Sequence, residues 1–289
     1  MNILHLDLDD NLRQLFPAVK RPPNNRVECI TCKSQSVLSA SAIKKFPRLT
    51  LIVARTVGVD NIDLNYCKAH NIAVYHTSDY GSQVVAEHAL ALTLAGARHI
   101  VQADREVHSG KFSYERFLGM AIGGKTIGVV GTGRIGSAFI KLLSPFGVHI
   151  LAYDLVKNIR VSYVSLRELL EKSDIVSIHV PLLPATKHLI GENEIQYMKQ
   201  GSILVNTSRG AIIDTNSLIK NIQKFHAVCL DVVENEDKFT KQNPLLRYEN
   251  VIITPHIGFY TDQSIKRIVK ETERCIINYV RGNQKGRMV

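Results

Sequence analysis

Ile127-Gly-Val-Val-Gly131-Thr-Gly133-Arg-Ile-Gly136 is the stretch that decides the fold of this chain. It belongs to an apolar run that begins at Thr126 and it opens a helical pattern, which is the context expected of a dinucleotide-binding loop. Gly131 permits a tight turn, Gly133 lets the backbone approach a pyrophosphate, and Gly136 allows close packing of helix against sheet. The free amides and positive dipole of the helix N-terminus favour phosphate oxygens.

Polar residues follow the later apolar runs, at the point where each run ends. They are Asp154 after HILAY, His179-Val-Pro181 after DIVSI, Thr207-Ser-Arg209 after SILVN, Asp231 after HAVCL, and His256 after VIITP. Each run is typical of a buried parallel strand, and helical patterns lie between most of them. Because ligands of an open parallel sheet bind beyond the carboxyl ends of its strands, we expect these residues around one site.

The composition is typical of a globular protein. The chain has 289 residues, of which 45% are apolar and 21% are charged, so it is large enough for two packed cores. No apolar run approaches the roughly 20 residues that span a bilayer. The acidic N-terminus MNILHLDLDD lacks the basic start of a signal peptide. We therefore predict a cytoplasmic protein without a membrane partner.

The net charge of +10 raises the hypothesis of a nucleic-acid partner. The basic residues are dispersed, however, apart from a tail at Arg281–Arg287 that we expect to be frayed. We predict no nucleic-acid partner. The positive potential would attract an anionic cofactor and a carboxylate substrate, or would serve only as a solvated surface.

The five cysteines are odd in number and scattered, which argues against a disulfide framework. Cys29 and Cys32 form a CxxC pair, but a zinc site needs a second ligand pair at suitable spacing, and none follows. We predict structural thiols and no metal.

Strand and helix patterns alternate on both sides of a long central helix. The early strand patterns are Ile3–Leu8, Val27–Thr31, Leu51–Ala54 and Ile72–Tyr75, with helical patterns at Ser39–Phe46 and Ile62–His70. The central run from about Gln83 to His108 is apolar nearly all round, which predicts burial at a domain or subunit interface, and Gly110 would end it. A final amphipathic helix is predicted over Thr261–Val280.

These patterns predict an α/β protein with two domains. We expect a Rossmann-type, doubly wound parallel sheet over residues 82–261 that binds NAD. A second, smaller, flavodoxin-like α/β domain, formed by residues 1–81 and 262–289, would act as the substrate domain or lid. The helix at residues 83–108 and the NAD domain would form the interface of a homodimer.

Asp154 lies 18 residues past Gly136, at the end of the next strand pattern. Its carboxylate can accept hydrogen bonds from both hydroxyls of an adenosine ribose, and it would repel a 2′-phosphate. The sequence therefore favours NAD over NADP as the cofactor, although Lys157 and Arg160 nearby weaken this preference.

Three residues could carry the reaction. Arg209 offers a guanidinium that grips a carboxylate in a bidentate fork, His256 is a candidate acid–base group, and Glu236 adds a carboxylate. Each one alone is more often a surface or packing residue. Together, beside a nicotinamide, they fit hydride transfer to a 2-keto acid.

These motifs resemble the D-isomer-specific 2-hydroxyacid dehydrogenase family along most of the chain. The matching stretches, in order, are Arg55-Thr-Val-Gly-Val-Asp-Asn-Ile-Asp63, Val85-Ala-Glu-His88, GTGRIG with Asp154, His179-Val-Pro181, Asn206-Thr-Ser-Arg-Gly210, Asp231 with Glu236, and Thr254-Pro-His-Ile-Gly258. Tyr80 and Phe259-Tyr260-Thr261 look similar to the D-lactate dehydrogenase branch of this family.

The resemblance implies a role for each matching residue. Arg209 would bind and polarise the substrate, His256 would donate the proton, and Glu236 would pair with His256 and hold its tautomer. The backbone amides of Val57 and Gly58 would hold the substrate carboxylate, with Tyr80 as a further substrate residue. The implied cofactor residues are Gly131, Gly133, Arg134, Ile135, Gly136, Asp154, His179, Val180, Pro181, Thr186, Thr207, Ser208, Asp231, which would lie near the nicotinamide, and Gly258.

Two other functions stay open on the same scaffold. One is an NAD-sensing, corepressor-like binding protein, and the other is a family member that acts on formate, phosphite or phosphoglycerate. The chain has no tryptophan, and its segment EDKF lacks the proline that many relatives carry there. These departures leave the identity of the 2-hydroxy acid open.

Overall fold

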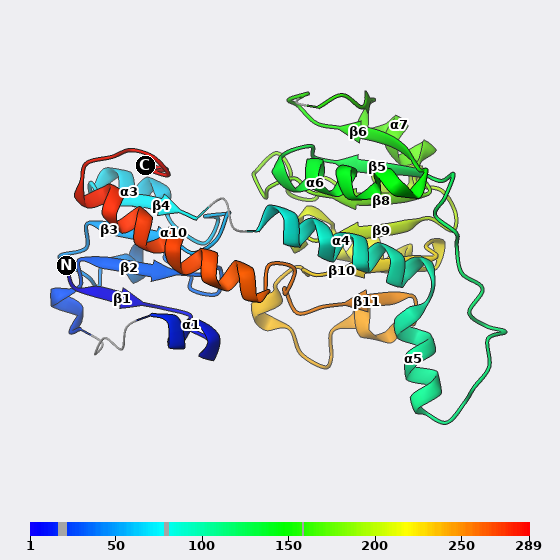
Figure 1. Ribbon diagram of the computed structural model, residues 1–289, viewed down its shortest axis with the longest axis horizontal. Helices are drawn as coiled ribbons and strands as arrows, with labels where there is room; N and C mark the ends of the chain where they lie inside the picture. The colour runs from blue at the N-terminus through cyan, green and yellow to red at the C-terminus, as the bar shows by residue number, and fades with distance from the viewer. Residues whose placement is uncertain (17–21, 78–80, 158) are drawn as a thin grey trace. The chain divides into compact units, whose positions relative to one another are not determined.

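The computed structural model describes residues 1–16, 22–77, 81–157 and 159–289, which form two compact units (Figure 1). The smaller unit comprises Met1–Gly81 and Tyr260–Val289, and the larger unit comprises Ser82–Phe259. Each unit contains one parallel sheet with helices packed on it, so the prediction of an α/β protein with two parallel sheets is confirmed.

The sheet of the smaller unit has the strand order β1-β2-β3-β4. The elements of this unit are β1 (Ile3–His5), α1 (Asp10–Leu15), η1 (Asn24–Arg26), β2 (Cys29–Cys32), α2 (Ala40–Ile43), β3 (Leu51–Ala54), α3 (Leu64–Ala69), β4 (Ala73–His76) and α10 (Asp262–Val280). Alternate residues of β3 face opposite ways: Ile52 packs in a cluster with residues of α2 and α3, and Val53 packs with Cys275 of α10. Both faces are buried, which explains why β3 is a continuous apolar run.

The sheet of the larger unit has the strand order β11-β10-β9-β8-β5-β6-β7. Its strands are β5 (Thr126–Val130), β6 (His149–Tyr153), β7 (Ser162–Tyr163), β8 (Ile175–Ile178), β9 (Ile203–Asn206), β10 (Ala227–Leu230) and β11 (Val251–Ile253). The order reverses between β5 and β8. Such a switch point is where a doubly wound sheet binds its ligand.

Helices cover both faces of this seven-stranded sheet. They are α4 (Ser82–Ala97), α5 (Ile100–His108), α6 (Arg134–Leu143), α7 (Leu166–Lys172), α8 (Glu192–Tyr197) and α9 (Thr215–Lys220), with 3-10 turns η2 (Ser144–Phe146), η3 (Gly210–Ile212), η4 (Ile222–Lys224), η5 (Glu236–Lys238) and η6 (Pro244–Arg247). Helices α4 and α6 pack on one face (Figure 1), and α7, α8 and α9 pack on the other. The loops described below follow the carboxyl ends of these strands.

The prediction of one continuous helix over residues 83–108 is wrong. The segment forms α4 and α5, which are bent by 63° at a break where His99 adopts the left-handed conformation, with φ of 51°. Helix α4 packs on the sheet, whereas α5 has no buried residue. Among the described residues, no single helix is long and apolar enough to cross a membrane, and α4 with α5 meets that test only as this bent pair.

The basic tail is not frayed as predicted, because it pairs with β4. Tyr75 and Arg287 form an antiparallel bridge, and the amide of Met288 donates to the carbonyl oxygen of Val74 at 2.7 Å. The Tyr75 hydroxyl donates to Asn283 O at 2.6 Å. The tail therefore occupies the free edge of the four-stranded sheet.

Gly96 of α4 lies against β10, so a substitution there tests how tightly this helix packs on the sheet. A Cβ atom on Gly96 would come within 2.6 Å of Cys229 Sγ and 3.0 Å of Ala227 Cβ. We expect Gly96→Ala to reduce the free energy of unfolding by about 1 kcal/mol, because overpacking costs about 1–3 kcal/mol and outweighs a helix-propensity gain of about 1 kcal/mol. Urea unfolding measures this change.

Gly123→Ala is the matched control, since its Cβ would make only an ordinary contact of 3.5 Å with Phe146 O. Both substitutions restrict the unfolded chain in the same way. A midpoint for Gly96→Ala at or above that of Gly123→Ala would show that the contact between α4 and β10 is not tight.

Candidate active site at the carboxyl ends of the strands

The glycine-rich loop joins β5 to α6 in the larger unit. Gly131 has φ of +97°, and a Cβ there would press on the backbone of His179 at 2.8 Å. A Cβ on Gly136 would overlap the carbonyl oxygen of Gly131, whereas one on Gly133 would meet nothing within 4 Å. The loop is therefore tightly packed on its protein side and open at Gly133, where the N-terminus of α6 begins without a side-chain cap.

Asp154 lies beside this loop, just after β6. Its Oδ2 accepts hydrogen bonds from Thr132 N at 2.6 Å and Thr132 Oγ1 at 3.1 Å, and its Oδ1 accepts from Val156 N at 3.0 Å. Burial opposes ionisation, but the hydrogen bonds from Val156 and Thr132 outweigh it and hold the pKa of Asp154 below its usual value. The carboxylate is charged at neutral pH and has acceptor capacity left for ribose hydroxyls.

His179 lies just after β8 and is almost completely buried. Its Nε2 shares a hydrogen bond with Ser177 Oγ at 2.9 Å, and its ring centre lies 5.1 Å from that of Phe139. Within the described residues, Nδ1 has no hydrogen-bond partner. Burial lowers the pKa of His179 to about 3, so its ring is neutral at neutral pH.

The segment after His179 shapes the wall beside the glycine loop. Val180 lies against Gly131, where an added Cβ would come within 2.8 Å of Val180 Cγ1. Thr186 Oγ1 donates to Pro181 O at 2.6 Å and accepts from Leu183 N at 2.8 Å. The side chain of Thr186 therefore folds this loop back on itself.

Asn206, the first residue of the Asn206–Gly210 motif and one to which the sequence assigned no role, folds the loop that carries Arg209. Its Nδ2 donates to Arg209 O at 2.9 Å, and its Oδ1 accepts from Ser208 N at 3.0 Å and from Ser208 Oγ at 2.7 Å. Arg209 Nη1 donates to Ser208 O at 2.9 Å. Thr207 Oγ1 is buried and has no partner in the part of the chain that the structure describes.

Asp231 is 1% exposed and accepts three hydrogen bonds just after β10, with the His88 ring beside it. Its Oδ1 accepts from Thr254 Oγ1 at 2.6 Å and from Ile257 N at 2.9 Å, and it lies 3.2 Å from His88 Nε2. Its Oδ2 accepts from Gly258 N at 2.8 Å. Burial opposes the charge, but the bonds from His88, Thr254, Gly258 and Ile257 keep the pKa of Asp231 below its usual value. His88 and Thr254 lie in stretches that match the family's motifs, but the sequence assigned neither of them a role.

His256 is held in the left-handed conformation, with φ of 54°, by the loop that Asp231 anchors. Its amide donates to Asp231 O at 2.8 Å, and its Nδ1 lies 2.8 Å from Glu236 Oε1. Gly210 brings the Arg209 loop against the same region, because a Cβ there would overlap the backbone of Val233. The loop after β10 is thus in contact with the loops after β9 and β11.

Three groups that could bind a metal come together within the described ranges: His188, Asp214 and Glu234, whose ligand atoms lie within 4.8 Å of one another. Each already has a partner in the protein. His188 Nε2 lies 2.8 Å from Glu234 Oε1, and Asp214 Oδ2 accepts from Ser217 Oγ at 2.6 Å. The bond between His188 and Glu234 fixes the segment that leads to Glu236.

The residues predicted to hold the substrate carboxylate belong to the smaller unit. Val57 and Gly58 lie in the loop that follows β3, where Val57 is 43% exposed. Tyr80 lies outside the described residues.

Comparison with known proteins agrees with these motifs. Residues 90–258 match the model of the D-isomer specific 2-hydroxyacid dehydrogenase, NAD binding domain. The chain is 37% identical over 273 residues to a D-specific alpha-keto acid dehydrogenase of Enterococcus faecalis, covering 89% of this chain and 84% of that protein. It is also 37% identical to a glyoxylate reductase of Korarchaeum cryptofilum, covering 85% and 77% of the two chains.

The structure is similar to that of D-lactate dehydrogenase from Aquifex aeolicus complexed with NAD and lactic acid. The TM-score is 0.88 at 35% identity, covering 99% of this chain and 97% of that chain. The chain therefore belongs to the D-isomer specific 2-hydroxyacid dehydrogenase family. Within it, the chain is an NAD-dependent D-2-hydroxyacid dehydrogenase that interconverts 2-keto and D-2-hydroxy acids, as predicted.

The local geometry fits NAD. The open position at Gly133 and the uncapped first turn of α6, which Arg134 and Ile135 begin, suit a pyrophosphate. Two buried polar atoms, His179 Nδ1 and Thr207 Oγ1, lack a partner among the described residues and follow neighbouring strands at the same sheet edge. The prediction of NAD as cofactor is confirmed.

His179 makes the stability of the larger unit depend on pH. Its pKa is about 3 in the folded protein and about 6.5 for an ordinary exposed histidine, so the unfolded chain binds more protons between these pH values. Stability falls as pH decreases below about 6.5, by up to roughly 1.4 kcal/mol per pH unit. We expect His179→Gln to flatten this dependence in urea unfolding between neutral and acidic pH.

His149→Gln is the control, because His149 is an exposed histidine at the start of β6. If the two variants lose stability equally steeply on acidification, the burial of His179 is not the cause of the dependence.

Proposed function

We propose that this chain reduces a small 2-keto acid with NADH, using His256 as the proton donor. The hydrogen bond of 2.8 Å between His256 Nδ1 and Glu236 Oε1 carries the proposal. Because Nδ1 is directed to the carboxylate, Nε2 is the nitrogen that can give its proton to the substrate. NADH, when bound, supplies the hydride that reduces the ketone carbon.

His256 and Arg209 act on the same developing charge. The imidazolium of His256 protonates the ketone oxygen as it becomes an alkoxide, which contributes roughly 10²–10⁴-fold to the rate. The Arg209 guanidinium stabilises that oxygen and binds the substrate carboxylate. Glu236 holds the His256 ring in one orientation, so the donor needs no reorganisation during the reaction.

The two parts of the chain bind different partners. Residues 82–261 bind NAD, and residues 1–81 with 262–289 bind the substrate through the amides of Val57 and Gly58, with Tyr80 as a further contact. Asp154 selects NAD over NADP because its charged carboxylate receives the ribose hydroxyls and repels a phosphate. The other cofactor residues predicted from the sequence support the dinucleotide from the loops after β5, β8, β9, β10 and β11.

A small 2-keto acid is the substrate class that this set of groups favours. Relatives of this chain are named for alpha-keto acids and glyoxylate, and one solved relative binds lactic acid. Formate offers a carboxylate but no neighbouring ketone for His256 to protonate. A pure NAD sensor has no need of a histidine paired with a carboxylate, which is why the His256–Glu236 pair favours the enzyme.

The thiols support a reducing compartment such as the cytoplasm. All five cysteines are buried and free, including Cys29 and Cys32 of the CxxC pair. Proteins of oxidising compartments commonly use such cysteines in disulfides.

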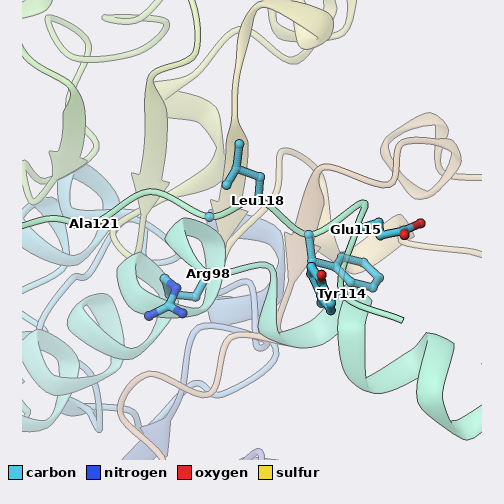
Figure 2. Close-up of a pocket in the computed structure, with 7 residues that line it drawn as sticks. Arg98, Tyr114, Glu115, Leu118 and Ala121 are labelled. Atoms are coloured by element: carbon cyan, nitrogen blue, oxygen red, sulfur yellow. The ribbon is translucent and has the colours of Figure 1, made fainter. Parts of the chain in front are cut away.

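A homodimer would cover the exposed apolar surface after the bend between α4 and α5. Phe112, Tyr114 and Leu118 are 93%, 87% and 88% exposed. Figure 2 shows Tyr114 and Leu118 at a cavity of about 550 Å³ that Arg98 also lines. Apolar groups this exposed mark an interaction site. A stable dimer buries about 800 Å² of each copy, so α5, where Ile100 is 57% exposed, would join the interface.

We expect the purified protein to consume NADH with at least one 2-keto acid in a screen of pyruvate, glyoxylate, hydroxypyruvate, phosphohydroxypyruvate and bulkier acids. With the best of these acids, His256→Ala should reduce kcat/KM by about 10²–10⁴-fold, because the proton donor is lost. The affinity for NADH should not change. Absorbance at the NADH band gives the rates, and fluorescence titration gives the affinity.

His108→Ala is the matched control, since His108 is an exposed histidine at the end of α5. It should behave as the wild type. NADH binding without turnover of any acid would favour the sensor, and near-normal turnover by His256→Ala would remove His256 from the mechanism.

If the surface formed by Phe112, Tyr114 and Leu118 is the dimer interface, a charged side chain placed in it should prevent dimerisation. Leu118→Glu should convert a dimer of the 32.3 kDa chain to a monomer, as measured by size-exclusion chromatography with light scattering. Val37→Glu, at a position 69% exposed in the smaller unit, should leave the dimer intact. A Leu118→Glu protein that remains dimeric would exclude this surface as the interface.

A further inference from the structure

The loop after β3 is held at both of its ends by backbone and amide contacts within the smaller unit. Before the loop, the amide of Arg55 donates to Cys32 O at 2.7 Å and continues the pairing of β3 with β2. After it, Asn61 Nδ2 donates to Lys33 O at 2.9 Å and to Ser36 O at 2.8 Å. The residues between these anchors have a defined path.

Two side chains hold the carbonyl groups of this loop. His76 Nδ1 lies 2.8 Å from Val57 O, and Thr56 Oγ1 donates to Gly58 O at 2.6 Å. Since a carbonyl oxygen only accepts, the Nδ1 atom of His76 must carry a proton in this contact. The amide nitrogens of Val57, Gly58 and Val59 have no acceptor among the described residues.

Because the peptide bond is planar, the contacts of the two carbonyl groups also set the direction of the amide groups that follow them. In a trans peptide, the carbonyl of one residue and the N–H of the next point in opposite directions. The structure has no cis peptide bond in its described part. The contact of Val57 O with His76 therefore directs the Gly58 N–H away from His76. The contact of Gly58 O with Thr56 likewise directs the Val59 N–H away from the Thr56 hydroxyl.

The backbone of His76 is itself fixed, so its ring is a rigid support. His76 is the last residue of β4 and pairs in register with Ala54 of β3. Its amide donates to Gly286 O of the tail at 3.2 Å, and its carbonyl oxygen accepts from Cys275 Sγ of α10 at 3.6 Å. Three separate parts of the smaller unit thus fix the point from which the imidazole reaches Val57.

The geometry assigns His76 and Thr56 the role of positioning residues for a group of successive amides that binds the substrate carboxylate. Val59 joins Gly58 as a donor in this group, beyond the two amides that the sequence predicted. Successive N–H groups that point to one side form an anion-binding concavity. The inference rests on the proposed function, in which this loop receives the carboxylate, and it names the side chains that preorganise it.

The substitutions His76→Leu and His76→Asn test whether the hydrogen-bond donor of residue 76 matters, as distinct from the shape of its side chain. Asparagine places Nδ2 as many bonds from Cα as histidine places Nδ1, so it can keep the bond to Val57 O, whereas leucine cannot. With the NADH-bound protein, we expect His76→Leu to raise the KM of the best 2-keto acid by about tenfold, the effect of losing one hydrogen bond of about 1.4 kcal/mol. The dissociation constant of oxamate, an unreactive analogue of pyruvate, should rise equally.

His76→Asn should restore both constants to within about threefold of the wild type, a difference below 1 kcal/mol. The dissociation constant of NADH and kcat should change much less than KM, because the loop acts on the carboxylate. Thr56→Val and Thr56→Ser provide the same contrast at the second carbonyl. This second pair decides the question if His76→Leu does not fold.

The outcomes distinguish this inference from the proposed function. Wild-type turnover of a 2-keto acid with an unchanged KM in His76→Leu and Thr56→Val would overturn the inference alone. An equal loss in His76→Leu and His76→Asn, at unchanged melting temperature, would also overturn it, because the donor would then not matter. A wild-type protein that neither binds oxamate nor turns over any 2-keto acid would overturn both.

Discussion

The buried carboxylate of Asp231 is the group on which the candidate site depends. A charge in this position is unfavourable unless polar contacts replace its hydration, and here three hydrogen bonds and the imidazole of His88 do so. Two of these donors, the amides of Ile257 and Gly258, belong to the loop that follows β11, and His88 belongs to α4. One side chain therefore ties a helix to two strand ends. Without it, several buried donors would lose their acceptor together.

This anchoring explains how His256 can keep an unfavourable backbone conformation. The left-handed region costs a non-glycine residue about 1–2 kcal/mol, and the bond from the His256 amide to Asp231 O helps to hold it there. This backbone conformation directs the His256 ring so that its Nδ1 atom lies 2.8 Å from Glu236 Oε1. Glu234, held by His188, fixes the segment before Glu236. The orientation of the candidate acid–base pair thus depends on contacts made by residues around it.

The sequence predicted most of the strands and the polar residues that follow them, because both depend on local pattern. Continuous apolar runs buried on two faces and the glycines before α6 leave few alternatives for a parallel sheet. The break at His99 could not be predicted, since the apolar pattern continues through it and only a backbone dihedral marks it. The anchoring roles of His88, Asn206 and Thr254 could not be predicted either, because each depends on a partner far away in space or on a loop path. The pairing of the tail with β4 could not be predicted, because it uses backbone atoms and composition does not reveal such contacts.

The smaller unit is made of two segments, Met1–Gly81 and Tyr260–Val289, which the larger unit separates along the sequence. Its four strands are synthesised before Ser82–Phe259, whereas α10, which packs against one face of them, is synthesised after that segment. During that interval Leu51, Val53 and Tyr75 lack the side chains of α10 against which they pack. The larger unit can fold as it emerges, whereas the smaller one must wait until α10 has been synthesised. Nascent chains stalled before α10 would therefore expose one apolar face of the four-stranded sheet, which chaperones could bind.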